Sequence, residues 1–161
     1  MNAWCHGAPG IGLSRLRAFE LLKKEEYADA ARVAIQTTLE AESKLKNNCE
    51  EVAARSYTLC HGSGGNAELF LEAYKIFGNE KYLLLAEKVA LQTLAHGKMN
   101  HGYISGYGRA GTQKDLSLFM GKAGVGYFYL RVFAQENRTK DISANDFCIG
   151  KAVAASDDQL F

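Results

Sequence analysis

Three copies of a short glycine-containing segment constrain the fold of this 161-residue chain more than any other feature. Residues 4–16 (WCHGAPGIGLSRL) align with residues 59–71 (LCHGSGGNAELFL) at an offset of 55, and residues 117–130 (SLFMGKAGVGYFYL) follow at a further offset of 59. The paired glycines that correspond in the three copies are Gly7 and Gly10, Gly62 and Gly65, and Gly121 and Gly124. Self-similarity at this period predicts a stacked supersecondary unit, made of a GxxG turn, a helix, a short break and a second helix.

The two helices of each unit differ in character. Residues 66–77 and 125–133 are apolar almost all round, which predicts helices that are buried on every face. Residues 27–46 and 81–97 are amphipathic, with apolar or small side chains at spacings of three and four. A single proline in the whole chain also suits helices. We therefore predict an all-α fold, a partial α/α toroid (α/α barrel) of repeated inner and outer helix pairs with GxxG turns, or else an α-solenoid.

The sequence between the helices predicts where they end. Lys23 to Glu26 forms the break in the first unit, and Gly78-Asn79 forms it in the second. The repeats occupy residues 1–136, whereas residues 137–161 are polar and weakly patterned and are expected to form a tail.

A long glycine-rich connection at residues 96–115 leads into the third unit. We expect His96 and His101, which lie in it, to be surface histidines, with a substrate-facing role as the alternative for either. Arg109 is a candidate for binding an acidic group.

Composition excludes several classes of protein. The net charge of +1 gives no reason to expect a nucleic-acid-binding face, and no apolar run is long enough to span a bilayer. The N-terminal residues lack the pattern of a signal peptide, which favours a cytoplasmic protein. The four cysteines are therefore expected to be free thiols rather than disulfides.

Two of those cysteines lie at equivalent positions of the repeat, each followed by His-Gly. If the units stack side by side, Cys5 and Cys60 become neighbours, and His61 lies next to Cys60. Two thiolates and an imidazole form a good zinc-binding set, with a fourth position open for water or substrate. His6 is either that fourth ligand or an acid or base that faces the substrate.

The setting of these motifs adds two expectations. Each Cys-His-Gly segment precedes a helix, whose free N–H groups favour a thiolate, and its first glycine is expected to adopt backbone angles forbidden to other residues. The third unit has Phe119-Met120 at the equivalent place, so it offers no further thiolate or imidazole.

These motifs resemble the last three GxxG units of the lanthionine synthetase C-like family. The similarity covers residues 1 to about 136, and the sequences of the motifs are most similar to those of the cyclase domain at the C-terminus of type 2 lanthipeptide synthetases. The resemblance implies an α/α toroid of seven inner and seven outer helices, with zinc held at Cys5, Cys60 and His61. His6 matches a position that carries Tyr or His in the family.

The resemblance also implies an activity and its partners. Zinc would activate a cysteine thiol of a dehydrated precursor peptide, and the thiol would add to dehydroalanine or dehydrobutyrine to form a lanthionine or methyllanthionine ring. With about three of seven units present, we expect the missing N-terminal part of the toroid as a second partner, and apolar surface where it would pack. Two alternatives stay open, which are addition of glutathione to dehydroamino acids and a zinc-binding or peptide-binding remnant without catalysis.

Overall fold

Helices make up the fold throughout the part of the chain that the computed structural model describes, residues 2–45, 48–103 and 115–135. The helices of this part are α1 (Ala8–Leu22), α2 (Glu25–Ser43), α3 (Cys49–Ala54), α4 (Ser63–Phe77), α5 (Glu80–Met99) and α6 (Lys122–Phe133). The β-structure of these residues is one isolated bridge between Ala3 and His6. The prediction of an all-α fold is therefore confirmed.

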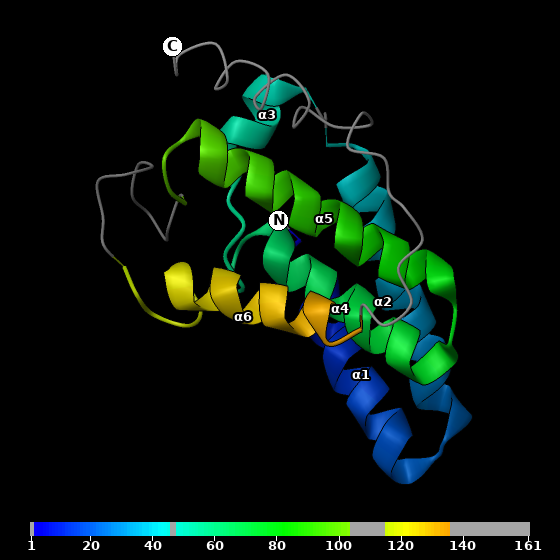
Figure 1. The fold of residues 1–161 in the computed structure, drawn as a ribbon. Coiled ribbons are helices and arrows are strands. Elements are labelled where there is room, and N and C mark those ends of the chain that lie inside the picture. Colours follow the sequence, from blue (N-terminus) through cyan, green and yellow to red (C-terminus); the bar gives the residue numbers. More distant parts are fainter. Residues whose placement is uncertain (1, 46–47, 104–114, 136–161) are drawn as a thin grey trace, which may run out of the picture.

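The helices form two layers, as the repeat predicts (Figure 1). In the inner layer, α4 lies between α1 and α6 and contacts both. In the outer layer, α2 packs on both α1 and α4, and α5 packs on both α4 and α6. Each outer helix thus covers the junction between two inner helices, which is the staggered arrangement of a partial α/α toroid.

The core is centred on α4. Leu69, Phe70 and Leu71 are at most 1% exposed, and burial of each such side chain contributes about 1.5–3 kcal/mol. The buried residues of the outer helix α2 are mostly small, namely Ala28, Ala31, Ala34 and Thr38 beside Ile35. Thr38 and Thr93, which match in the repeat, are both fully buried and donate their hydroxyls to the carbonyl four residues earlier, at 2.8 and 2.7 Å.

The prediction that the inner helix of the third unit is buried on every face is wrong. On α6, Phe128 is fully buried, but Tyr127, Leu130 and Phe133 are 41%, 69% and 71% exposed. The first inner helix, α1, likewise leaves Ile11 more than half exposed. Exposed large apolar side chains thus occur on both inner helices that flank α4, and they also occur on the outer helices, as at Val33 and Leu84.

The predicted break at Gly78-Asn79 is confirmed, whereas the break predicted at Lys23 to Glu26 is shorter, because α2 already begins at Glu25. Lys23 and Gly78 both adopt left-handed backbone angles, with φ of 56° and 68°. Each donates its N–H to a carbonyl four residues earlier, at 2.9 and 2.8 Å, and so ends its helix.

The predicted connection at residues 96–115 begins later than expected, because α5 continues to Met99. His96 is consequently inside a helix and fully buried, so the prediction of a surface histidine is wrong. Its Nδ1 lies 3.1 Å from the carbonyl oxygen of Val52 in α3, a short helix that the sequence pattern did not predict. Burial lowers the pKa of His96. His101 is exposed, as predicted.

Two predictions fall on residues that the structure does not describe. Arg109 and the predicted tail at residues 137–161 both lie outside the described residues, as does Cys148. None of the described helices is long and apolar enough to cross a membrane.

Candidate metal centre

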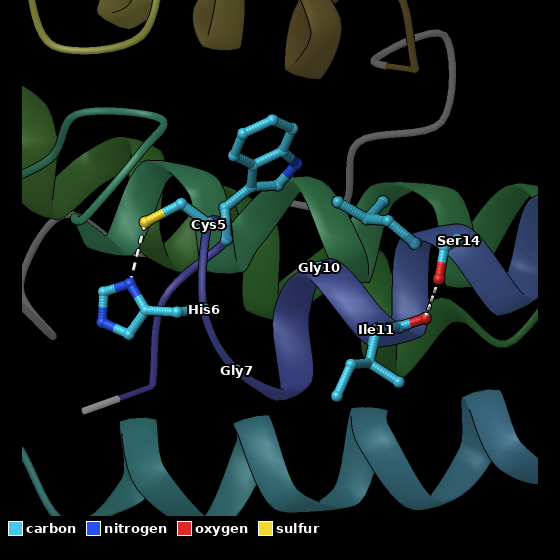
Figure 2. Close-up of a pocket in the computed structure, with 8 residues that line it drawn as sticks. Cys5, His6, Gly7, Gly10, Ile11 and Ser14 are labelled. Atoms are coloured by element: carbon cyan, nitrogen blue, oxygen red, sulfur yellow. Dashed lines mark hydrogen bonds between the residues drawn. The ribbon is translucent and has the colours of Figure 1, made fainter.

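The first repeat shows how the chain brings its Cys-His pair to the start of an inner helix (Figure 2). The segment with Cys5 and His6 runs past the first turn of α1 and turns into it at Gly7, whose φ is +154°. The close packing requires Gly10, because a Cβ there would lie 2.0 Å from the carbonyl oxygen of Trp4.

The same close approach recurs in the other two units. A Cβ on Gly65 would lie 1.8 Å from the carbonyl oxygen of Leu59, and a Cβ on Gly124 would lie 1.9 Å from that of Leu118. At the first glycine of each pair, φ is −110° for Gly62 and −120° in the third unit, which other residues also adopt. The expectation of forbidden backbone angles is therefore wrong for these two units, where glycine is required by the lack of space.

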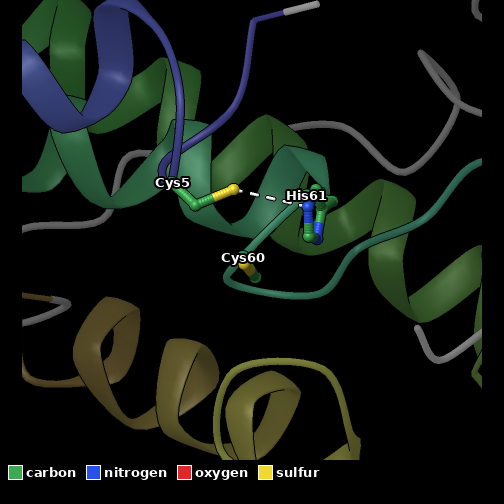
Figure 3. Close-up of side chains that lie close together, drawn as sticks. All are labelled: Cys5, Cys60 and His61. Carbon is green, nitrogen blue, oxygen red and sulfur yellow. Dashed lines mark hydrogen bonds between the residues drawn. The ribbon is translucent and has the colours of Figure 1, made fainter.

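The repeat brings the three predicted ligands together (Figure 3). The candidate ligand atoms of Cys5, Cys60 and His61 all lie within 4.8 Å of one another, although Cys5 comes from the first repeat. Cys5 Sγ lies 3.3 Å from His61 Nε2. A tetrahedral zinc site, with bonds of about 2.0–2.3 Å, needs ligand atoms roughly 3.5–3.8 Å apart. The spacing of this group therefore fits a zinc ion with small adjustments of the side chains.

The electrostatics at Cys60 differ from those that the sequence predicts. Burial, assisted by the adjacent Cys5 thiol, raises the pKa of Cys60 to about 11. This differs from the expectation that the helix N-terminus favours a thiolate, and it means that the protein alone keeps this sulfur protonated at neutral pH. A divalent cation is the partner that stabilises two adjacent thiolates, and its binding would release their protons. Cys5, Cys49 and Cys60 are all free thiols, as predicted.

His6 lies beside this group rather than in it. Its Nδ1 is 2.9 Å from Cys5 Sγ, but it does not belong to the set of ligand atoms within 4.8 Å of one another. Its exposed ring faces away from α1, near a cavity of about 490 Å³ that Cys5 and His6 line together with Trp4, Ile11 and Ser14 (Figure 2). His6 is therefore outside the candidate ligand group in this structure.

The loop of the third repeat also contacts the candidate ligand group, which the sequence pattern does not predict. The carbonyl oxygen of Phe119 accepts the N–H of Cys60 at 2.9 Å, and its ring stacks on Trp4 with centroids 4.9 Å apart. Met120 Sδ lies 3.3 Å from His61 Nδ1. The alignment of the repeats does place Phe119 and Met120 at the positions of Cys60 and His61. Neither residue is a strong metal ligand, so the pattern does not single them out.

A second contact group holds the two Cys-His segments together. Glu42, from the outer helix α2, accepts hydrogen bonds from the side chains of Asn66 at 2.7 Å and Ser63 at 3.3 Å, both in the first turn of α4. Asn66 also donates to the carbonyl oxygen of Asn2, whose side chain accepts the N–H of Ala8 at 3.2 Å. This chain of contacts connects the segment before Cys5 to the helix that follows His61.

Fold and site together define a class, an α/α repeat protein with a Cys-Cys-His group that could hold a metal ion at the ends of its inner helices. The comparisons with known proteins agree, because residues 1–143 match the family described as lanthionine synthetase C-like protein. The chain belongs to this family. It is also 32% identical over 125 residues to the zebrafish (Danio rerio) protein named glutathione S-transferase LANCL1. The match covers 78% of this chain and 27% of the relative, so the chain corresponds to about a quarter of that protein.

Proposed function

We propose that this chain provides the zinc centre of an enzyme that adds a thiol to a dehydroamino acid, forming a C–S bond. The observation that carries the proposal is the convergence of Cys5, Cys60 and His61 within 4.8 Å, in a chain that belongs to the lanthionine synthetase C-like family. Three protein ligands leave one position of a tetrahedral set open, which is the pattern of catalytic rather than structural zinc sites.

The chain's own residues would divide the work. When bound, zinc would lower the pKa of a coordinated substrate thiol, so that it releases its proton near neutral pH. Cys5 and Cys60 make the ligand set net anionic, which keeps a coordinated sulfur electron-rich. The substrate sulfur bonds to the β-carbon of the dehydroamino acid, and the α-carbon takes up a proton, so no redox partner is needed. His6 can deliver that proton from Nε2 when it is an imidazolium, which keeps its Nδ1–H toward the Cys5 thiolate, and the proton released by the substrate thiol can recharge it.

Two thiol donors fit this chemistry. The first is a cysteine of a dehydrated precursor peptide, which would give a lanthionine or methyllanthionine ring. The second is glutathione, and the name of the zebrafish relative, a glutathione S-transferase, favours it. A cavity of about 490 Å³ beside Cys5 and His6 is the candidate place for a donor to approach the site. We propose a cytoplasmic setting for both reactions, because Cys5, Cys49 and Cys60 are free thiols.

We further propose that additional helix pairs complete the toroid around the site. The exposed apolar side chains of α1 and α6, among them Ile11, Leu130 and Phe133, provide the surface against which such pairs would pack. The chain corresponds to 27% of its zebrafish relative, which leaves ample length for them.

The metal site is tested first by zinc content. Cys60→Ala removes one of two thiolates, so we expect the purified variant to lose its zinc, whereas Cys49→Ala, a change in α3 away from the site, should retain it. Atomic absorption after gel filtration measures both, and circular dichroism verifies the fold. Full zinc retention in folded Cys60→Ala would refute the proposed centre.

The thiol donor is tested next, with the chain alone and combined with the N-terminal units of a LanC-like relative. A dehydrated peptide with an internal cysteine is incubated with and without glutathione. Cyclisation removes the alkylatable thiol without a change of mass, whereas glutathione addition increases the mass by one glutathione. Zinc binding without either product would instead favour a non-catalytic, zinc-binding or peptide-binding remnant.

A further inference from the structure

The third repeat lacks metal ligands, yet its loop lies directly against the ligands of the other two. Met120 occupies the position that His61 has in the second repeat, and its Sδ lies 3.3 Å from the Nδ1 of His61. The opposite ring nitrogen, Nε2, lies 3.3 Å from Cys5 Sγ. The two nitrogens of His61 therefore face two different sulfurs, one in the proposed ligand set and one outside it.

These contacts assign different roles to the two nitrogens. A metal that sits among Cys5, Cys60 and His61 is reached by Nε2, so Nδ1 must carry the ring proton. An Nδ1–H group beside a half-buried thioether donates to it, since a Met sulfur is a weak acceptor. Metal-binding histidines usually donate this second N–H to an acceptor that fixes ring orientation and tautomer.

We infer that Met120 is a positioning residue, whose thioether accepts the Nδ1–H of His61 and thereby holds Nε2 toward the two cysteines. This inference rests on the proposed zinc centre. Met120 can serve in this way because its own place is fixed. Its N–H donates to Ser117 Oγ at 3.3 Å, and the preceding carbonyl, that of Phe119, accepts the N–H of Cys60 at 2.9 Å.

The test compares three substitutions in the full chain. Met120→Leu keeps the size and apolar character of the side chain but removes the acceptor. Met120→Gln supplies an amide oxygen as a replacement acceptor. Met99→Leu is the matched control, a partly buried methionine in α5 that packs against the core. Zinc affinity is measured by competition with a chromophoric chelator.

We expect Met120→Leu to weaken zinc binding about tenfold, at the low end of the roughly 10–100-fold loss seen for residues that support metal ligands. Met120→Gln should recover most of this loss, and Met99→Leu should bind as the wild type does. Equal affinities for Met120→Leu and Met99→Leu would overturn the inference, as would a Met120→Gln variant no better than Met120→Leu.

A second measurement keeps the inference testable if a variant fails to fold. Nitrogen-15 NMR of His61 in the zinc-free wild type reports which ring nitrogen carries the proton. Protonation of Nδ1 is expected, and protonation of Nε2 alone would overturn the inference. Failure of the wild type to bind zinc at all would instead refute the metal centre, so the two failures are distinguishable.

Discussion

The loops of the second and third repeats have nearly the same backbone and different chemistry. Gly62 and Gly121 each donate their N–H to the carbonyl oxygen four residues earlier, at 3.1 Å in both loops. Ser63 and Lys122, one residue later, donate to carbonyl oxygens seven residues earlier, at 3.1 and 3.0 Å. The fold of the loop is therefore independent of the two residues before the first glycine. Those residues can therefore be candidate metal ligands in one copy and contact the candidate ligands in the other.

The helices that follow the two loops differ more than the loops do. In α4 nearly every residue from Ser63 to Tyr74 is buried, because helices pack on it from several sides. In α6, by contrast, the buried residues are Gly124, Val125, Phe128 and Val132. Equivalent positions thus have very different environments, and paired substitutions can measure the difference.

The largest difference is expected at Leu71 and Leu130, which are equivalent in the repeat but 1% and 69% exposed. Leu71→Ala should lower the free energy of unfolding by about 2–5 kcal/mol, because it leaves a cavity in the core. Leu130→Ala should change it by less than about 0.5 kcal/mol. Urea unfolding followed by circular dichroism measures both. Similar losses for the two variants would show that α6 is covered in solution.

The next prediction concerns Glu68, a buried carboxylate of α4 whose equivalent in α6 is Tyr127. Burial raises the pKa of Glu68 to about 7, and the ion pair with Arg131 of α6, at 3.2 Å, only partly opposes this. A raised folded-state pKa means that the contribution of Glu68 to stability is fully present below pH 4.5 and is lost as pH rises to about 7. The loss is at most about 3 kcal/mol.

Glu68→Gln, which cannot ionise, should remove this dependence. The free energy of unfolding of the wild type, relative to that of the variant, should therefore fall between pH 4.5 and pH 7.5. Urea denaturation at several pH values measures the difference, in which the other titrating groups largely cancel. If the free energies of unfolding of the two proteins change with pH in the same way, the ion pair with Arg131 cancels the effect of burial on the pKa of Glu68.

The sequence predicted what repeats in this molecule and missed what does not. The grouping of Cys5, Cys60 and His61 is predictable because two loops contain the same Cys-His-Gly sequence. Stacked repeats bring equivalent positions close together in space. The burial of His96 was not foreseen, because it depends on α3, a short helix with no counterpart in the repeat pattern. The sequence indicates only that Met120 offers neither a thiolate nor an imidazole, since spacing alone does not show which side chain faces the ring of His61.

The smallest expected effect concerns Glu42, whose carboxylate accepts side-chain hydrogen bonds from the first turn of α4 in the second repeat. It accepts hydrogen bonds from Ser63 and Asn66, at positions where the third repeat has Lys122 and Val125. Glu42→Gln replaces a charged acceptor by a neutral one, so we expect a loss of about 1 kcal/mol in the free energy of unfolding. Glu40→Gln, on the exposed face of the same helix, is the control and should cost less than about 0.5 kcal/mol.

Because Asn66 also connects to Asn2, near Cys5, Glu42→Gln should weaken zinc binding as well. A chelator competition that finds unchanged zinc affinity would show that the loops hold the two Cys-His pairs together without help from the outer helix.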